Sequence, residues 1–379
     1  MMYWRLSGFY LFYFASLGAL VPYWSLYLKS LDFSVTEIGQ LFAILMGTKI
    51  VAPNVWGWIA DHTGHRMAIV RIASLLAALA FLGVFVSSDF WWIALVMTVF
   101  SFFWNASLPQ FEATTMSHLG GETHRYSGIR LWGSVGFIVA VVVLGPVLGQ
   151  FGAGYLPYIL APVFLLIWLS SQLVPESAAG HLPLDQERLR DVLRRPVVLS
   201  LLAVCFLVQA SHGPYYAFFT LYLEDYGYST ALIGQLWALG VLAEIGVFLL
   251  MPMLLPRFGA RRLLLAAVAL TILRWLLIAG FAASPAVILF AQVLHAASFG
   301  LYHAVAIFLV HRLFTGAHQG RGQALYSSIS FGAGGAAGSL ASGYLWTGIG
   351  PQAMYLLSAA ASLVALVVVY AGIRTYPAD

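Results

Sequence analysis

The stretches SLYLKSLDFSVTEIGQL, Ser25 to Leu41, and TLYLEDYGYSTALIGQL, Thr220 to Leu236, decide the fold, because one repeats the other. Leu-Tyr-Leu, a later serine and Ile-Gly-Gln-Leu coincide without a gap at a separation of 195 residues. The same separation places Gly64-His65-Arg66 on Gly259-Ala260-Arg261. A constant separation over this length indicates that the two halves of the chain share one fold.

The composition shows what kind of protein carries this repeat. Hydrophobic residues make up 61% of the 379 residues and charged residues only 8%, so a soluble domain could not cover its surface. Apolar segments of about 20 residues recur, as expected for membrane-spanning helices. Twelve are predicted, near residues 6–28, 37–60, 66–87, 90–117, 127–150, 155–174, 197–223, 231–255, 262–283, 285–313, 320–346 and 351–373. The prediction is an all-α integral membrane protein of two pseudo-symmetric six-helix bundles.

The distribution of charge predicts the topology. Arginines gather in alternate connections, whereas the opposite connections are mainly acidic, so both termini are expected in the cytoplasm. The formal charge of +4 therefore has a topological meaning and does not indicate nucleic-acid binding. The longest polar connection predicts a cytoplasmic linker, residues 175–196, between bundles 1–174 and 197–379. Its charges predict a short surface helix from Asp185 to Arg195.

A lone carboxylate, Glu244, stands in the middle of the apolar run LWALGVLAEIGVFLLMP, Leu236 to Pro252. A charge at that depth costs at least ~2.5–3.5 kcal/mol by insertion scales. The 195-residue separation places Lys49 at the equivalent position of the second predicted span. Such charges usually line a substrate or ion path, so we expect Lys49 and Glu244 to pair at a central cavity. The alternative is an ion pair that only holds the two halves together.

Further candidate residues lie inside the predicted spans of the second half. The position equivalent to Arg274 is Leu79, so the repeat offers Arg274 no obvious partner. A guanidinium binds a carboxylate bidentately, which suits an organic acid as substrate; alternatively Arg274 binds a neighbouring helix or extends to the membrane surface. The remaining candidates are titratable, amide or aromatic side chains, each of which could instead be structural: His212, His295, His303, Gln209 and Trp237.

Metal binding is not expected from the histidines. His295 and His303 are eight residues apart, or about 12 Å along one helix, which is too far for one metal ion. The glycine spacing of Gly334 and Gly338 in SFGAGGAAGSLASG, Ser330 to Gly343, predicts close helix approach in the eleventh span.

The connection after the second span, GWIADHTGHR, resembles the major facilitator signature G-x-x-x-D-R-x-G-R-R. The resemblance implies a gating role for a glycine turn and for charges that latch the cytoplasmic side. Histidines stand at positions 62 and 65, where the signature has arginine. The matching positions are Gly57, Asp61, Gly64 and Arg66.

Two narrower resemblances bear on the substrate. NASLPQFEA, Asn105 to Ala113, followed by GIRLWGSVG, Gly128 to Gly136, is similar to the lactose permease region that supplies a sugar-binding Glu and Arg. That similarity implies these roles for Glu112 and Arg130, which are 18 residues apart as in that family. QASHGPYYAFFTLYL, QLWALGVLAE, LRWLLIAG and QVLHAASFGLYHA resemble the phenylpropionate permease subfamily, which is related to lactose permease and the nucleoside:proton symporters.

Together these features predict a transporter and not an enzyme. The expected activity is uptake of a small aromatic monocarboxylate, such as 3-phenylpropionate, in symport with H⁺. The chain is expected to be a monomer in a bacterial inner membrane, to be driven by the proton gradient, and to need no cofactor or metal. One alternative is a sugar or nucleoside proton symporter. The other is a proton-antiport drug or metabolite exporter, because LGPVLGQ, Leu144 to Gln150, partly resembles an antiporter signature. An intramembrane enzyme or a receptor has no supporting motif, since the chain lacks HExxH and GxSxG.

Overall fold

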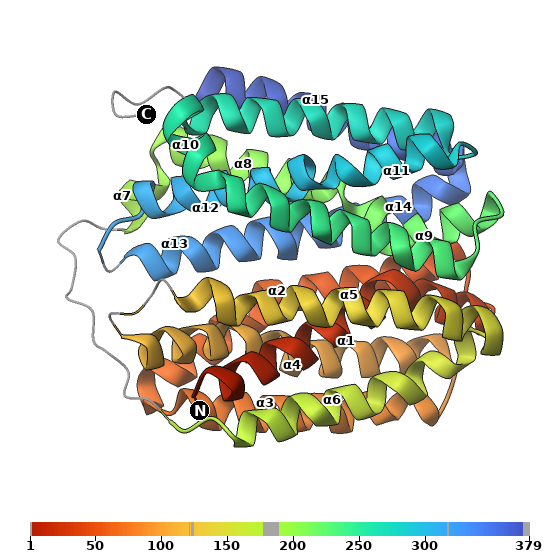
Figure 1. Cartoon of the computed structure of the whole chain (residues 1–379), viewed down its shortest axis with the longest axis horizontal. Helices are drawn as coiled ribbons and strands as arrows, with labels where there is room; N and C mark the ends of the chain where they lie inside the picture. Colours follow the sequence, from red (N-terminus) through yellow and green to blue (C-terminus); the bar gives the residue numbers. More distant parts are fainter. Residues whose placement is uncertain (1, 121, 123–124, 177–188, 317, 374–379) are drawn as a thin grey trace. The chain divides into compact units, whose positions relative to one another are not determined.

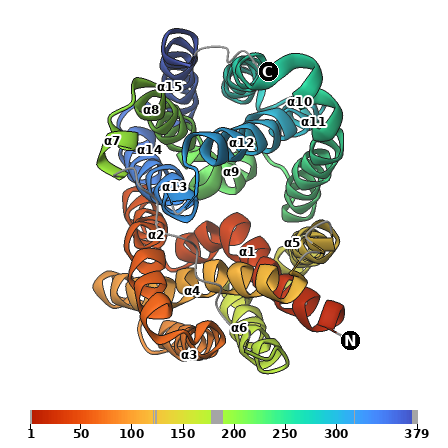
Figure 2. The same cartoon turned by 90° about the vertical axis from the view of Figure 1, so that its left-hand side faces the viewer.

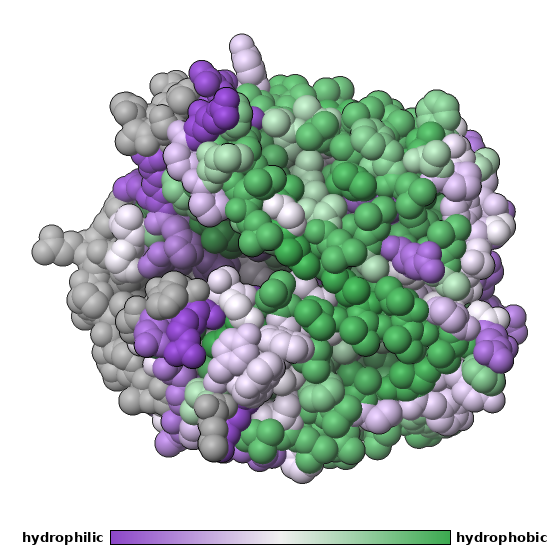
Figure 3. Space-filling model, viewed as in Figure 1, coloured by the Kyte–Doolittle hydropathy of each residue, from purple (hydrophilic) through white to green (hydrophobic). Residues whose placement is uncertain are grey.

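The computed structural model of the chain describes residues 2–120, 122, 125–176, 189–316 and 318–373, and this part is almost entirely helical (Figure 1). Contacts divide it into two compact units, residues 1–181 with 228–235, and residues 182–227 with 236–379. In the face shown in Figure 3, apolar side chains cover the middle of the helices of each unit and hydrophilic ones gather near the helix ends. This distribution is that of helices that cross a bilayer.

The first unit contains the helices of the first half of the chain. Helix α1 packs against α5 and α6, and α4 packs against α2 and α3 (Figure 2). A capping box, in which Ser34 and Glu37 bind each other's backbone, starts α2, and the Asp89 carboxylate caps α4. The elements are α1 (Met2–Ser30), α2 (Val35–Thr63), α3 (Arg66–Phe81), η1 (Leu82–Phe85), α4 (Phe90–Leu119), α5 (Tyr126–Phe151), η3 (Ala153–Tyr155) and α6 (Leu156–Gln172).

The second unit is less regular, because two of its spans contain π-helical turns and one is broken. Helix α8 packs against α15, and α14 packs against α9. The elements are α7 (Leu189–Leu193), α8 (Pro196–Ser211), α9 (Gly213–Asp225), α10 (Thr230–Phe281), α11 (Pro285–Val293), the π-helical η4 (Ala296–Leu301), α12 (Tyr302–Leu313), α13 (His318–Ser327), the π-helical η5 (Ser328–Gly334), α14 (Gly335–Ile349) and α15 (Pro351–Gly372).

The described residues contain 10 helical segments long and apolar enough to cross a membrane. One of them, the 52-residue α10, has a non-helical residue at Gly259 that divides it into two spans. The stretch from α13 to α14 is helical over residues 318–349 and supplies the remaining span. The prediction of twelve spans in an all-α fold is confirmed.

Two places in the second unit have irregular local geometry, and one local prediction needs correction. The predicted seventh span, residues 197–223, is present as the apolar span Pro196–Asp225, and it consists of two helices that meet at His212. The eighth and ninth spans meet directly at Gly259, and α10 is helical on both sides of this residue. The predicted surface helix is short: α7 covers only Leu189–Leu193, and residues 185–188 of that prediction lie outside the described part of the chain.

Residues with positive φ, each at a turn or a break, recur at matching places in the two halves. Asp32 and Gly227, with φ of 62° and 82°, are 195 residues apart, and so are Gly64 and Gly259, both with φ of 72°. These and two further pairs are all the residues with positive φ in the described part, so the internal repeat extends to the backbone. The further pairs, 196 and 198 residues apart, are Gly120 with Gly316 and Gly152 with Gly350.

Glycines allow close contacts between equivalent pairs of helices in both units. A Cβ atom on Gly136 of α5 would lie 2.0 Å from the Leu11 carbonyl oxygen of α1. A Cβ on Gly338 of α14 would lie 2.2 Å from the Ala210 carbonyl oxygen of α8. Only glycine permits these backbones to touch. The predicted close approach at Gly338 is confirmed.

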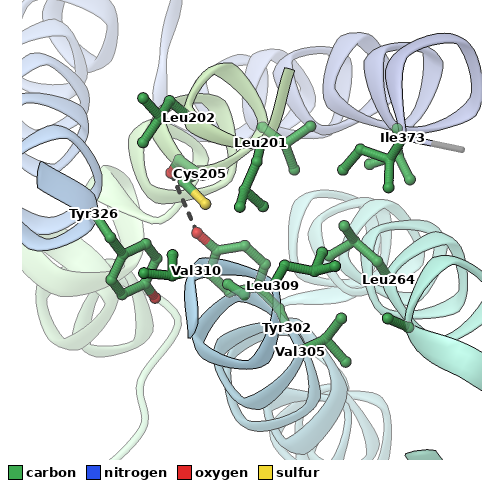
Figure 4. Packing of buried hydrophobic residues seen from close by; sticks show 14 of the residues in the cluster. Leu201, Leu202, Cys205, Leu264, Tyr302, Val305, Leu309, Val310, Tyr326 and Ile373 are labelled. Atoms are coloured by element: carbon green, nitrogen blue, oxygen red, sulfur yellow. Dashed lines mark hydrogen bonds between the residues drawn. The ribbon is translucent and has the colours of Figure 1, made fainter. Parts of the chain in front are cut away.

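The second unit has an apolar core at the end that holds α7. Leu264, Val305 and Leu309 are among its buried residues, and Figure 4 shows how they pack. Within this core the Tyr302 hydroxyl donates to the Cys205 carbonyl at 3.4 Å. Tyr302 and Cys205 are therefore parts of the packing.

Candidate functional site

The buried carboxylate of Glu244 contacts a histidine. In the second unit, Glu244 of α10 lies 2.7 Å from His295 Nε2, and both side chains are nearly inaccessible to solvent. Two glycines leave room for this pair: a Cβ on Gly300 would lie 3.3 Å from Glu244 Cγ, and one on Gly240 would lie 3.1 Å from the His295 ring. His295 immediately precedes the π-helical η4. An imidazole that touches a carboxylate can exchange a proton with it.

Arg274 is fully buried and has three protein acceptors. Its Nε donates to the Ala291 carbonyl at 3.0 Å, Nη1 to Ser298 at 3.1 Å and Nη2 to Gln292 at 3.0 Å. These contacts are those of the alternative in which Arg274 binds a neighbouring helix. These partners lie 17 to 24 residues further along the chain, on the next span, so residue spacing could not reveal them.

Aromatic rings enclose the Arg274 guanidinium. Its Cζ lies 4.2 Å from the centre of the Tyr215 ring and 4.7 Å from that of Trp275. Such cation–π contacts stabilise a desolvated guanidinium. The Trp237 ring lies 4.4 Å from Tyr215, and its indole nitrogen donates to Thr220. The candidate Trp237 therefore belongs to the same aromatic cluster.

The break in the seventh span fixes the position of His212. Pro214 cannot donate a backbone hydrogen bond, and the His212 amide turns to the Gln209 carbonyl at 3.1 Å. The Val208 carbonyl, which that amide would bind in a regular helix, instead accepts from His212 Nδ1 at 2.8 Å. His212 is fully buried, and its ring centre lies 6.4 Å from that of His295. Two predicted histidines thus lie in one cluster.

The third candidate histidine lies apart from the Glu244 contact. His303 Nδ1 is 2.7 Å from the Tyr326 hydroxyl. Phe299 stacks on both His295 and His303, with ring centres 5.6 Å away in each case. The histidines predicted about 12 Å apart are therefore separated by a phenylalanine ring.

The first unit brings Glu112 and Arg130 together. Arg130 Nε lies 3.7 Å from a Glu112 carboxylate oxygen, and both side chains are about one third exposed. The Arg130 guanidinium lies over the Phe14 ring, 3.8 Å from its centre. Gly133 makes room for this stack, because a Cβ there would lie 2.7 Å from Arg130 Nη1 and 2.8 Å from Phe14. A partly open cation beside aromatic rings is suited to an aromatic acid.

Lys49 is half-buried in α2. Among the described residues, its one polar contact is with the Met46 sulfur, 3.6 Å from Nζ. Lys49 belongs to the first unit and Glu244 to the second, and their pairing stays a prediction. Near Lys49, Thr48 binds Ser101 and Asn105, which fixes α2 against α4.

The motif after the second span forms a glycine turn with an ion pair. Gly64 ends α2 in the left-handed conformation, and Arg66 Nη2 lies 3.2 Å from Asp61. Gly57 lies one turn before Asp61 on α2. Glu176, which the sequence motifs do not include, accepts from the Met67 amide at 3.0 Å and so caps α3. No local pattern identifies Glu176, because it follows α6, 109 residues away.

Comparison with known proteins agrees with this architecture. The family model described as the MFS_1 like family matches residues 3–357. A probable 3-phenylpropionic acid transporter of Escherichia coli (strain K12) is 27% identical over 368 residues, which covers 94% of each chain. The maltose permease of Geobacillus stearothermophilus is also 27% identical over 368 residues, covering 95% of this chain and 92% of the permease.

Solved structures show the same fold. A mutant form of the nucleoside transporter NupG superposes with a TM-score of 0.87, covering 99% of this chain and 100% of that one. The sequences are 18% identical, so this likeness concerns the fold alone.

Proposed function

The chain belongs to the MFS_1 like family of membrane transporters, and we propose that it imports a small aromatic monocarboxylate together with a proton. The observation that carries the proposal is the 2.7 Å contact of Glu244 with His295 inside the second unit. A symporter needs a group that gains and loses a proton in each cycle. A buried carboxylate and imidazole in contact supply such a group without any cofactor.

The nature of the substrate is supported by the relatives and by the first unit. A relative that matches this chain over nearly its whole length is named a probable 3-phenylpropionic acid transporter. Arg130 stacks on Phe14, within 4 Å, and lies near Tyr10 as well. A guanidinium next to aromatic rings is able to hold a carboxylate and a phenyl ring at the same time.

Uptake by reconstituted protein tests the proposal. We expect proteoliposomes with an inwardly directed proton gradient to accumulate radiolabelled 3-phenylpropionate. A pH dye outside the vesicles is expected to report alkalinisation during uptake. Accumulation under an outwardly directed proton gradient would show antiport instead. Empty liposomes control for diffusion of the protonated acid through the lipid.

The Arg130→Lys variant tests how the substrate carboxylate is bound. Lysine keeps the charge but loses the planar fork and its stack on Phe14. We expect KM for 3-phenylpropionate to rise about tenfold, the equivalent of 1.4 kcal/mol, with little change in maximal rate. The control is Arg125→Lys, whose exposed contact with Glu122 lies outside this pair. An unchanged KM would remove Arg130 from the binding site.

A sugar or nucleoside proton symporter is the second candidate, because the maltose permease is also 27% identical to this chain over 368 residues. A thermal-shift screen over aromatic acids, sugars and nucleosides distinguishes the two. A ligand that binds only the folded protein raises the melting temperature of the protein. The increase grows with the logarithm of the ligand concentration once that concentration exceeds Kd. Stabilisation by maltose and not by 3-phenylpropionate would favour the second candidate.

We also infer that the protein is a monomer in a bacterial inner membrane and that both termini lie in the cytoplasm. The orientation is supported by the position of basic residues: Arg66 and Arg71 lie in the first half of α3, and Arg257, Arg261 and Arg262 lie near Gly259 in α10. Fluorescent and phosphatase fusions at the C-terminus test the orientation. Phosphatase activity there would place that end on the opposite side.

A further inference from the structure

Two short motifs of the second unit carry four polar atoms without partners. Gln209-Ala-Ser-His212 ends α8, and Gln292-Val-Leu-His295 spans the end of α11. All four Gln and His side chains are at least nine-tenths buried. Within the described part of the chain, the following atoms have no hydrogen-bond partner: Gln209 Oε1, His212 Nε2, Gln292 Nε2 and His295 Nδ1. Buried polar atoms normally have partners, so this group indicates something bound between them.

The hydrogen-bonding pattern shows what the two open imidazole nitrogens can do. His212 Nδ1 faces the Val208 carbonyl, which can only accept, so Nδ1 carries the hydrogen. The neutral His212 ring is therefore an acceptor at Nε2. His295 Nε2 faces Glu244, and when that carboxylate is ionised Nε2 carries the hydrogen. The neutral His295 ring is then an acceptor at Nδ1. Both acceptor nitrogens are places for a proton.

The distance between the rings suits one intervening water molecule. Their centres are 6.4 Å apart, so even two nitrogens that face each other are separated by more than the ~2.9 Å of a direct hydrogen bond. A buried water needs two to four polar partners, and the two motifs supply donor and acceptor atoms of the required kinds. Ring contacts hold the histidines in place, because His212 packs edge-on against Trp275 at 4.8 Å and His295 lies 5.2 Å from Tyr215.

We propose that His212 is a second proton-holding residue of the transport cycle, joined to His295 by a buried water between the two Gln-x-x-His motifs. This inference rests on the proposed proton coupling at Glu244. A proton on His212 Nε2 passes to the water, and the water gives one of its own hydrogens to His295 Nδ1. His295 then releases its Nε2 hydrogen to Glu244. The water molecule is regenerated, because it gains one hydrogen and loses another. The net result is a neutral carboxyl group on Glu244 and a neutral His212.

The surrounding charges limit the pair to one proton. Arg274 of α10 is the nearby cation, and it stacks on the same Tyr215 ring that contacts His295. Glu244, also of α10, is the nearby anion, and Tyr215 and Tyr216 of α9 are the nearby hydroxyls. The Glu244 carboxylate compensates one positive charge on the two histidines. A second positive charge there would be repelled by the first and by the Arg274 guanidinium. The two histidines are therefore alternative sites for one proton.

Nitrogen-15 NMR on the full-length protein in nanodiscs, with histidine labelled, tests the inference without any substrate. We expect His212 Nε2 and His295 Nδ1 to gain hydrogen together as the pH falls, with one proton taken up between them. His212→Gln keeps a polar side chain that cannot titrate. In this variant we expect the midpoint of the His295 pH titration to move. His311→Gln, on the exposed end of α12, is expected to leave it unchanged. If His212→Gln does not fold, His212→Asn keeps a donor for the Val208 carbonyl and replaces it.

Transport of 3-phenylpropionate gives the second measurement. We expect His212→Gln to lose accumulation driven by the proton gradient and to retain exchange of labelled for unlabelled substrate. A His212 Nε2 that gains no hydrogen while the protein stays folded, or an unmoved His295 midpoint, would overturn the inference. Failure of the proposed function is a different result: wild-type vesicles would not accumulate 3-phenylpropionate, whatever the histidine spectra show.

Discussion

In the Glu244→Gln variant, uptake driven by a proton gradient falls by about 100-fold, at the lower end of what a positioned proton-transfer group contributes, while substrate exchange continues. Glutamine has nearly the same size as glutamate and can still accept from His295, so the packing around Gly300 is kept. An amide cannot take up a proton, and the coupled step is lost. Exchange needs no net proton movement and therefore survives.

Two assays on the same proteoliposomes separate these effects. Accumulation of radiolabelled 3-phenylpropionate under an inwardly directed proton gradient measures the coupled step, and counterflow without a gradient measures exchange. The matched control is Glu37→Gln, because glutamine also completes the capping box of α2. Undiminished accumulation by Glu244→Gln would show that another residue carries the proton.

Replacement of Gly136 by valine is expected to have the largest effect on stability. Even the Cβ atom would lie 2.0 Å from the Leu11 carbonyl oxygen and 2.9 Å from its carbon, so α1 and α5 have to move apart. Overpacking of a filled interior costs about 1–3 kcal/mol, and here the obstacle is backbone, which yields least. We expect a markedly lower melting temperature in detergent and a poor yield of monodisperse protein.

The control for this variant lies on the partner helix. A Cβ atom added to Gly8 of α1 would meet nothing within 4 Å, so Gly8→Ala is expected to melt like the wild type. Gly136→Ala gives an intermediate test, since it introduces only the clashing atom. If Gly136→Ala also melts like the wild type, α1 and α5 are not held at this contact.

The helices and their internal repeat could be predicted from the sequence alone. The partners of the buried side chains could not. Twelve spans follow from apolar length, which the bilayer imposes on each helix separately. The partners of Arg274 and Glu244 depend on how helices rotate against each other, and residue spacing carries no such information. The break at His212 is an intermediate case, because Gly213-Pro214 is a visible signal inside a run that is otherwise uniformly apolar.

The site was predicted unevenly for the same reason. Glu112 and Arg130, whose binding roles come only from a resemblance, lie 3.7 Å apart, and Gly133, three residues later, leaves room for the Arg130 side chain. The π-helical turn after His295 leaves no mark in the residue pattern. It arises from packing, and such turns are frequent where function requires an unusual side-chain direction.

The eight residues with positive φ also record where chain length has changed since the halves diverged. Their separation is 195 residues at the first two turns, 196 at the third and 198 at the fourth. One residue was therefore gained or lost between the second and third turns, and two more between the third and fourth. If the chain arose by duplication of a six-helix ancestor, the second helix of each half has kept its length, while length has changed further along.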